Sequence, residues 1–366
     1  MKSLTTAVLL VATLMSEAQA QQSCKPEFPF RDGWWGADGG YSILLPTGET
    51  FWLFDDSFVG TAKNRSRSGT KMINSTIALG SCDRDGKFTV RYVWAGQGTS
   101  HPGAIFPPVP KQYKYWAENG FTHGRDVYVV LQMIRDRPDI QGAFNWEEIG
   151  TRLARIRNVD RPFSDWSIDY FDLYRGKVFP GQSVVKQDGY VYLFSPTDTG
   201  DAQHSPTFLT RFAESVLDDR SPKIELEYLA NDGSWKHIAP HGIDFADAKR
   251  VMDNPFAANS VWYEPERKRW VAVGQNAVFR SNEAVVRTAE SLTGPWSAPS
   301  LLYRIPDADT AHGADKDTWC YQTIAHPEFS RGDAILLTYV CNSFDFGKLV
   351  NDVGIYVPKA VYVRLP

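Results

Sequence analysis

Three carboxylates stand near the ends of two predicted strands early in the chain. Residues 37–43 and 50–58 read as strands joined by a polar turn, with Asp38 opening the first and Asp55 and Asp56 near the end of the second. Because a hairpin returns the chain to where it started, we expect Asp38 and Asp56, which are 18 residues apart, to lie close together. Two carboxyl groups at one end of a sheet are the smallest set of side chains that could carry out general acid–base hydrolysis of a glycosidic bond. The alternative is that Asp55 and Asp56 are turn residues, since Asp is common after strands.

The strand–turn–strand pattern that carries these carboxylates recurs along the chain. A small polar cluster opens each unit, a short apolar strand follows, and an aromatic-rich strand returns after a bend. The five units cover residues 39–58, 115–131, 181–194, 259–274 and 321–340. Further alternating strands fit outer positions at 74–79, 151–157, 207–212 and 284–289. Antiparallel units repeated every roughly 60–80 residues predict an all-β fold, a five-bladed β-propeller. The alternative is a large β-sandwich or jelly roll.

In a propeller the innermost strand of each blade lines a central channel, so the polar openings of the units converge on one pocket. We expect Glu118 to be the third carboxylate there, although an exposed turn residue before Gly120 is the alternative. Amide side chains at or beside the unit openings are candidates for hydrogen bonds to sugar hydroxyls, or for satisfying strand ends: Asn74, Gln182, Asn259 and Gln322. Indole rings beside the openings are candidates for stacking on sugars, or for core packing: Trp34, Trp35 and Trp116.

Two sequence motifs resemble a known group of enzymes. Residues 287–296 end in Ser-Leu-Thr-Gly-Pro-Trp, which looks like the S-x-x-G-P-W blade ending common in five-bladed propeller glycoside hydrolases, such as the family 43 arabinanases and xylosidases. The stretches 38–42, 54–58 and 74–78 are similar to a related group that includes endo-D-arabinanases. That group shows D-G…L-F-G-D-T-F followed by an Asn-rich strand, and the order of motifs matches over most of the chain after residue 20.

The resemblance implies a glycoside hydrolase in which Asp38 and Asp56 form the catalytic pair. Position in the motif selects Asp56, while Asp55 stands where the related group usually has Gly. By resemblance alone, furanosides that contain arabinose are the first substrate expected. The sugar, the linkage and the roles of acid and base stay open, as do stereochemistry, oligomeric state and endo or exo action.

The N-terminus and the cysteines indicate export. Residues 1–20 combine a positive start, a short apolar run and a small-x-small site, which predicts a signal peptide cleaved after Ala20. Residues 21–366 are then expected to form one catalytic domain of a secreted or periplasmic protein. The four cysteines allow 3 pairings. Cys320–Cys341 could join neighbouring strands and Cys24–Cys82 could pin the N-terminus, whereas free buried thiols are the alternative.

Charge and composition limit the classes of partner that we expect the protein to bind. The net charge is only −4 and no basic run is present, so nucleic acid is not expected as a partner. No stretch after the N-terminal one is long and apolar enough for a membrane span. The chain holds 12 Trp and 13% aromatic residues, which suits sugar binding as well as a packed β-core. The expected partner is a polysaccharide or oligosaccharide.

No cofactor is expected, and no zinc spacing, P-loop or Gly-x-Ser-x-Gly motif is present. Some five-bladed relatives hold a calcium ion in the channel with a histidine, so His326 and Glu328 leave a structural calcium open by resemblance. The acidic segment 306–318 lacks the EF-hand pattern and is expected to be a solvated surface loop that could overhang the pocket.

Two other functions fit the same composition. A polysaccharide lyase would use a Tyr or His base and a group that neutralises a uronate, for which the candidates are Tyr321, His326 and Arg125. A lectin-like propeller would bind glycans through its Trp side chains without cutting them.

Overall fold

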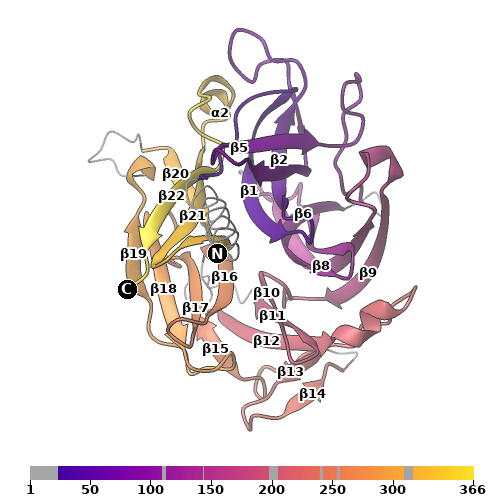
Figure 1. Ribbon diagram of the computed structural model, residues 1–366, viewed down its shortest axis with the longest axis vertical. Coiled ribbons are helices and arrows are strands. Elements are labelled where there is room, and N and C mark those ends of the chain that lie inside the picture. The colour runs from indigo at the N-terminus through magenta and orange to yellow at the C-terminus, as the bar shows by residue number, and fades with distance from the viewer. Residues whose placement is uncertain are drawn as a thin grey trace, which may run out of the picture.

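Five β-sheets surround a common centre in the computed structural model of the protein (Figure 1). The structure describes residues 24–108, 113–142, 144–197, 205–239, 242–253, 256–308 and 316–366. The predicted signal peptide lies outside these residues. The strand pairs are antiparallel, and strand order follows the chain from the centre outward, except that β3 pairs with β2 and β15 pairs with β12.

The strands of the five blades have the following bounds. Blade 1 contains β1 (Trp34–Leu44), β2 (Thr50–Val59), β3 (Lys71–Ile73), β4 (Thr76–Cys82) and β5 (Phe88–Val93). Blade 2 contains β6 (Lys114–His123), β7 (Asp126–Asp136), β8 (Trp146–Arg157) and β9 (Ser167–Arg175). Blade 3 contains β10 (Ser183–Gln187), β11 (Tyr190–Pro196), β12 (Pro206–Ala213), β13 (Glu227–Leu229), β14 (Trp235–His237) and β15 (Arg250–Asp253).

Blade 4 contains β16 (Phe256–Glu264), β17 (Arg269–Gln275), β18 (Glu283–Ala289) and β19 (Ser300–Arg304). Blade 5 contains β20 (Thr318–Arg331), β21 (Ala334–Ser343) and β22 (Lys359–Arg364). The short helices are η1 (Phe163–Asp165), η2 (Glu214–Asp218), η3 (Pro306–Ala308) and α2 (Phe346–Asn351). None of the helices in the described part of the chain is long and apolar enough to cross a membrane.

The innermost strands form a closed circle. β1 contacts β6, β6 contacts β10, β10 contacts β16, β16 contacts β20, and β20 contacts β1. The circle is tight where a Cβ on Gly120 of β6 would lie 2.3 Å from the Tyr128 carbonyl oxygen and 2.4 Å from Ile43 of β1. The all-β five-bladed propeller predicted from the repeats is thereby confirmed, as are the four outer strands.

The core lies between the blades because each middle strand is covered on both faces. Phe51 and Leu53 of blade 1 pack with Val127 and Val129 of blade 2 in one cluster. The next three interfaces repeat this arrangement between blades 2 and 3, 3 and 4, and 4 and 5. The fifth joins Phe58 of blade 1 to blade 5. Continuous apolar strands such as β7 are explained by this two-sided burial.

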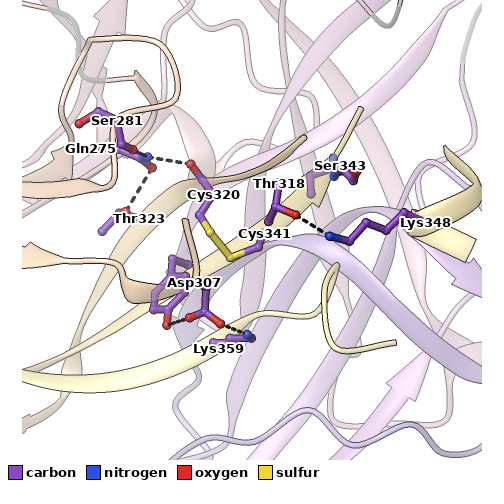
Figure 2. Close-up of a disulfide and its surroundings, with 12 residues drawn as sticks. Gln275, Ser281, Asp307, Thr318, Cys320, Thr323, Cys341, Ser343, Lys348 and Lys359 are labelled. Atoms are coloured by element: carbon purple, nitrogen blue, oxygen red, sulfur yellow. Dashed lines mark hydrogen bonds and ion pairs between the residues drawn. A yellow bond between two sulfur atoms is a disulfide. The ribbon is translucent and has the colours of Figure 1, made fainter. Parts of the chain in front are cut away.

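Two disulfides are present, Cys24–Cys82 and Cys320–Cys341, so the free-thiol alternative is wrong. Figure 2 shows the second one joining β20 to β21, with Asp307 beside it in contact with Lys359. Asp307 also accepts a hydrogen bond from the Tyr339 hydroxyl at 2.7 Å. The expectation of a solvated acidic loop therefore fails for Asp307, because its carboxylate is anchored to blade 5. Residues 309–315 of that segment lie outside the described residues.

Candidate active site

A β-bulge brings the three predicted carboxylates of blade 1 together. Ala37 pairs with Ser57 and Gly39 pairs with Phe54, so the single residue Asp38 on β1 faces both Asp55 and Asp56 on β2. In regular pairing, consecutive residues point to opposite faces of a sheet. The extra residue disrupts that alternation and re-aims the side chains. The charges of Asp38 and Asp56 both raise the pKa of Asp55, which confirms that the three groups are neighbours.

The hydroxyl of Tyr321 donates a hydrogen bond to Oδ2 of Asp38 at 2.5 Å. The other oxygen, Oδ1, is buried and has no hydrogen-bond partner among the described residues. Burial first, and the charge of Asp56 second, raise the pKa of Asp38 to about 7, against the lowering effect of the hydroxyls of Tyr321 and Tyr356. The unpartnered oxygen suits a neutral carboxyl, since a buried charge without partners is costly.

Asp56 is held in a different way. Asn74 Nδ2 and Trp116 Nε1 both donate to its Oδ1, at 2.9 Å and 3.1 Å. Burial raises the pKa of Asp56, while these two N–H groups and the charge of Lys114 lower it. Donors of this kind favour the ionised carboxylate. The pKa of Asp56 is raised overall, but its N–H donors counteract the effect of burial, whereas at Asp38 burial and the charge of Asp56 act in the same direction.

Asp55 is the buried link between three blades. Its Oδ1 accepts the backbone N–H of Ala117 in blade 2 at 2.6 Å, and its Oδ2 accepts Gln322 Nε2 in blade 5 at 3.2 Å. Gln322 in turn accepts the backbone N–H of Gly39 at 2.7 Å. Gln322 has a φ of 51°, an uncommon conformation for a side-chain-bearing residue. Because both Gln322 polar atoms contact protein, its side chain fixes the bulge.

Glu118 is nearly fully buried on β6 and points toward the same group of carboxylates. Gln132 Nε2 donates to its Oε1 at 2.5 Å, and Oε2 has no hydrogen-bond partner in the part of the chain described. Burial raises the pKa of Glu118 to about 8, so this carboxyl is neutral at neutral pH. The structure thus does not support an exposed turn residue here.

The other predicted sugar contacts divide into two groups. Trp116 and Asn74 contact Asp56, and Trp35 is partly exposed with its ring stacked on Phe30. Trp34 is completely buried, stacked on Tyr92 at 4.3 Å, and donates to Thr76, so its ring faces the core.

Gln182 and Asn259 belong to blades 3 and 4 and are also buried. Asn259 Nδ2 contacts the sulfur of Met252 at 3.8 Å, whereas Gln182 Oε1 has no partner in the described residues. Neither side chain contacts Asp38 or Asp56 in the hydrogen bonds of the described residues.

His326 and Glu328 lie away from the carboxylates, further along β20. The two ring nitrogens of His326 contact Ser42 Oγ at 2.6 Å and Thr338 Oγ1 at 2.8 Å. Burial lowers the pKa of this imidazole to about 3. Both ring nitrogens of His326 thus contact hydroxyl groups of the protein. No group of three metal-ligating side chains occurs among the described residues.

A cavity of about 300 Å³ lies beside these residues, at the opposite end of the inner strands from Asp38. Ser42, Lys186 and Glu328 line it, but none of the blade 1 carboxylates does. A larger cavity of about 770 Å³, lined by Arg152, Asp169 and Arg220 among others, lies beside β8 and β9 and also lacks these carboxylates. The paired carboxyl groups lie at the other end of the inner strands, where we locate the candidate active site.

The three lyase candidates do not converge. Arg125 lies in the turn between β6 and β7, with its side chain 88% exposed and paired with Asp160. Tyr321 contacts Asp38, whereas His326 packs on Trp52 and hydrogen-bonds Ser42. A base and a uronate-neutralising group are therefore not assembled from these residues.

The sequence pattern did not predict that Tyr321 and Tyr356 lie beside Asp38. Asn342 Nδ2 donates to the Tyr321 hydroxyl at 3.2 Å, which orients that hydroxyl toward Asp38. Tyr356 is buried, and burial together with the charge of Asp38 raises its pKa well above the usual range. Tyr356 lies between β21 and β22 in a segment without strand periodicity, and no sequence signal pointed to it.

Residues 28–363 match a family model described as "Domain of unknown function (DUF5005)". The chain belongs to this family. No curated protein matches it in sequence.

Among solved structures, the chain resembles a protein from Bacteroides ovatus that is provisionally assigned as a hydrolase. The two share 18% identity and a TM-score of 0.68, over 95% of this chain and 88% of that one. An α-L-arabinanase mutant from Cellvibrio cellulosa (12% identity, TM-score 0.43, 90% and 93% covered) and an endo-arabinase from Bacteroides thetaiotaomicron (9%, 0.45, 90% and 94%) also match. The first match confirms the shared fold.

Proposed function

We propose that this protein is a secreted glycoside hydrolase that cleaves an extracellular polysaccharide with Asp38 and Asp56. The observation that carries the proposal is the bulge that sets one carboxyl, Asp38, against its neighbour Asp56, which accepts two N–H donors. Two carboxyl groups whose surroundings separate their pKa values are the usual equipment for glycoside hydrolysis. Arabinofuranosyl polymers are the first substrate class, a choice that rests on the motifs of blades 1 and 4.

In the proposed mechanism Asp38 is the general acid. A pKa of about 7 keeps its proton in place at neutral pH and lets it pass to the oxygen of the leaving sugar. Asp56, whose ionised form is favoured by the N–H groups of Asn74 and Trp116, acts on the opposite side as base or nucleophile. The pKa values of Glu118 and Asp55 are raised by burial, and their hydrogen bonds to Gln132, Ala117 and Gln322 support the geometry of the pair.

Product release measured by mass spectrometry tests the proposal. Purified protein is incubated with arabinans, arabinogalactans, xylans and uronate polymers, with Asp38→Asn and Asp56→Asn beside it. We expect saturated oligosaccharides from the unmodified protein and a loss of about 10²–10⁴-fold in rate for each variant. The matched control is Asp85→Asn, an exposed turn residue of blade 1 whose change should leave the rate unaltered.

Other results would contradict the proposal in identifiable ways. Unsaturated products would identify a lyase. Binding of a glycan without any product, unaffected by Asp38→Asn, would identify a lectin-like propeller. Full activity in both Asp variants would show that the chemistry uses other residues.

A further inference from the structure

Four aromatic side chains gather at the end of the channel where the carboxylates lie. Phe144 of blade 2 contacts Phe279 of blade 4 and Trp319 and Phe344 of blade 5, with ring centroids 6.1 Å, 6.3 Å and 6.2 Å away. Trp319 and Phe344 stack on each other at 5.6 Å. We call these four residues the Phe144 cluster. Three of them keep more than 40% of their surface exposed.

The cluster crosses the mouth of the channel. Blade 2 borders blades 1 and 3, since its inner strand β6 contacts β1 and β10. Blades 4 and 5 lie on the other side of the circle. A side chain of blade 2 that contacts both of them therefore spans the opening between them. It divides the mouth into a part beside blade 1, which holds the carboxylates, and a part beside blade 3.

Both ends of the cluster connect to the catalytic pair. Trp319 stacks on Tyr321 at 4.4 Å, and the Tyr321 hydroxyl donates to Asp38. On the other side Trp146, two residues after Phe144, packs edge-to-face on Trp116 at 4.7 Å, and Trp116 donates to Asp56. Contacts thus run from one carboxyl to the other around the entrance.

The turn that carries Phe144 is fastened at its base. The backbone N–H of Arg137 donates to the Asn145 carbonyl at 2.7 Å, and its side chain donates to Asp139 and Glu147. These bonds hold Phe144 out over the channel instead of leaving it free to fold back on blade 2.

We propose that the Phe144 cluster closes the blade 3 side of the site, so that the protein cuts sugars from the end of a chain. A polymer lying across the mouth from blade 1 toward blade 3 meets the aromatic wall, whereas a chain end enters beside blade 1 and places its terminal sugars against exposed rings. The inference rests on the proposed glycoside hydrolase function and names its mode of action.

The test compares product lengths from linear arabinan at early conversion. The unmodified protein should release one short product of fixed length. Phe144→Ala should release mixed longer products and raise the rate of viscosity loss at least tenfold relative to total bonds cut. Phe245→Ala is the matched control, because Phe245 is an equally exposed ring on the outer part of blade 3, and it should behave as the unmodified protein. Mixed products from the unmodified protein would overturn the inference.

A second measurement does not depend on hydrolysis. In the double variant Phe144→Cys with Phe344→Cys, a short bismaleimide should link the two introduced cysteines in the folded protein. In the control variant Phe245→Cys with Phe344→Cys, the same reagent should not link the two cysteines. Absence of a cross-link between residues 144 and 344 would show that the Phe144 cluster does not span the mouth of the channel. If the cross-link forms but the unmodified protein cuts no polysaccharide of the panel, the hydrolase proposal is overturned and, with it, the chain-end mode.

Discussion

At the scale of single residues, protons on buried carboxyl groups connect function with stability. Burial raises the pKa of Asp38, Asp55 and Glu118 together, in a channel where no Lys or Arg pairs with them in the described residues. A site that keeps carboxyl groups neutral holds an acid ready at neutral pH. The same arrangement costs folding free energy once the unfolded chain would ionise those groups.

Tyr321→Phe should move the pH profile upward. The Tyr321 hydroxyl lowers the pKa of Asp38, so its removal raises that pKa above about 7. Since an acid works while protonated, the alkaline limb of kcat/KM should shift to higher pH, and the maximal rate should fall because Asp38 loses its orienting contact. The pH dependence of kcat/KM measures this. A limb that stays in place would show that Asp38 is not the titrating acid.

Asp38→Asn should stabilise the fold, and the gain should depend on pH. The folded pKa of Asp38 is raised from 3.8 to about 7, so the folded state holds a proton that the unfolded chain releases between these values. The free energy of unfolding therefore falls as pH rises through this window, and the amide removes that loss. Thermal unfolding of the variant should show a larger gain in Tm at pH 7 than at pH 4. An equal gain at both would contradict the assignment.

At the scale of elements, the connection from β21 to β22 depends on one buried arginine. Arg67, in the loop after β2, donates to the carbonyls of Leu349, Asp352 and Ile355 at 2.6–2.9 Å and to Trp35 at 2.7 Å. Burial lowers its pKa to about 10, so it remains charged. Its planar fork thereby fixes the segment that carries Tyr356 beside Asp38.

Arg67→Lys should loosen that segment. A lysine cannot reproduce the fork, and the loss of charged hydrogen bonds to buried carbonyls should lower the free energy of unfolding by about 2–3 kcal/mol. Urea unfolding measures this, and hydrolysis should decrease with it because Tyr356 is displaced. Arg65→Lys, an exposed change two residues away, is the control. If the two variants unfold alike, the carbonyl contacts do not hold the segment.

Prediction from sequence was strongest for elements and weakest for contacts between them. The hairpins, their repetition and the closeness of Asp38 and Asp56 follow from local alternation and turn residues. Both disulfide pairings were among those considered. The bulge that admits Asp55 was not foreseen, because an extra residue in one strand leaves no mark in the hydrophobic pattern.

Tyr321 reaches Asp38 through packing between blades 5 and 1, which are 283 residues apart at this contact, and Trp34 is placed in the core by stacking on Tyr92 at the far edge of its own blade. Periodicity carries no information on which of two neighbouring Trp residues turns inward. Local patterns could therefore predict the pocket's position but not its lining.

At the scale of the whole molecule, the N-terminal segment joins the last blade to the first. Cys24 is bonded to Cys82 of blade 1, and its carbonyl accepts hydrogen bonds from Arg331 at 2.8 Å and Tyr362 at 3.0 Å, both of blade 5. The blade 5 sheet has three strands, so this segment helps to close the ring where β22 is outermost.

Cys24→Ser together with Cys82→Ser should destabilise the ring without altering the site directly. The bond closes a loop with a sequence separation of 58, for which a loss of about 4 kcal/mol is expected. Calorimetry should show a lower Tm, while kcat at low temperature should stay near the original value, since neither cysteine approaches the carboxylates. Loss of kcat at full folding would show that ring closure reaches the site.

The bulge between Asp38 and the Asp55–Asp56 pair also limits how this gene can change. Loss of a single codon between Phe54 and Ser57 would remove this bulge and leave the reading frame intact, whereas the irregularities between Trp34 and Ala37 and between Gly39 and Tyr41 would remain. The strand would remain, yet one carboxylate would vanish and the residues beyond it would exchange faces. Lengths of this hairpin should therefore be fixed among sequences that keep the activity, while its side chains elsewhere remain free to vary.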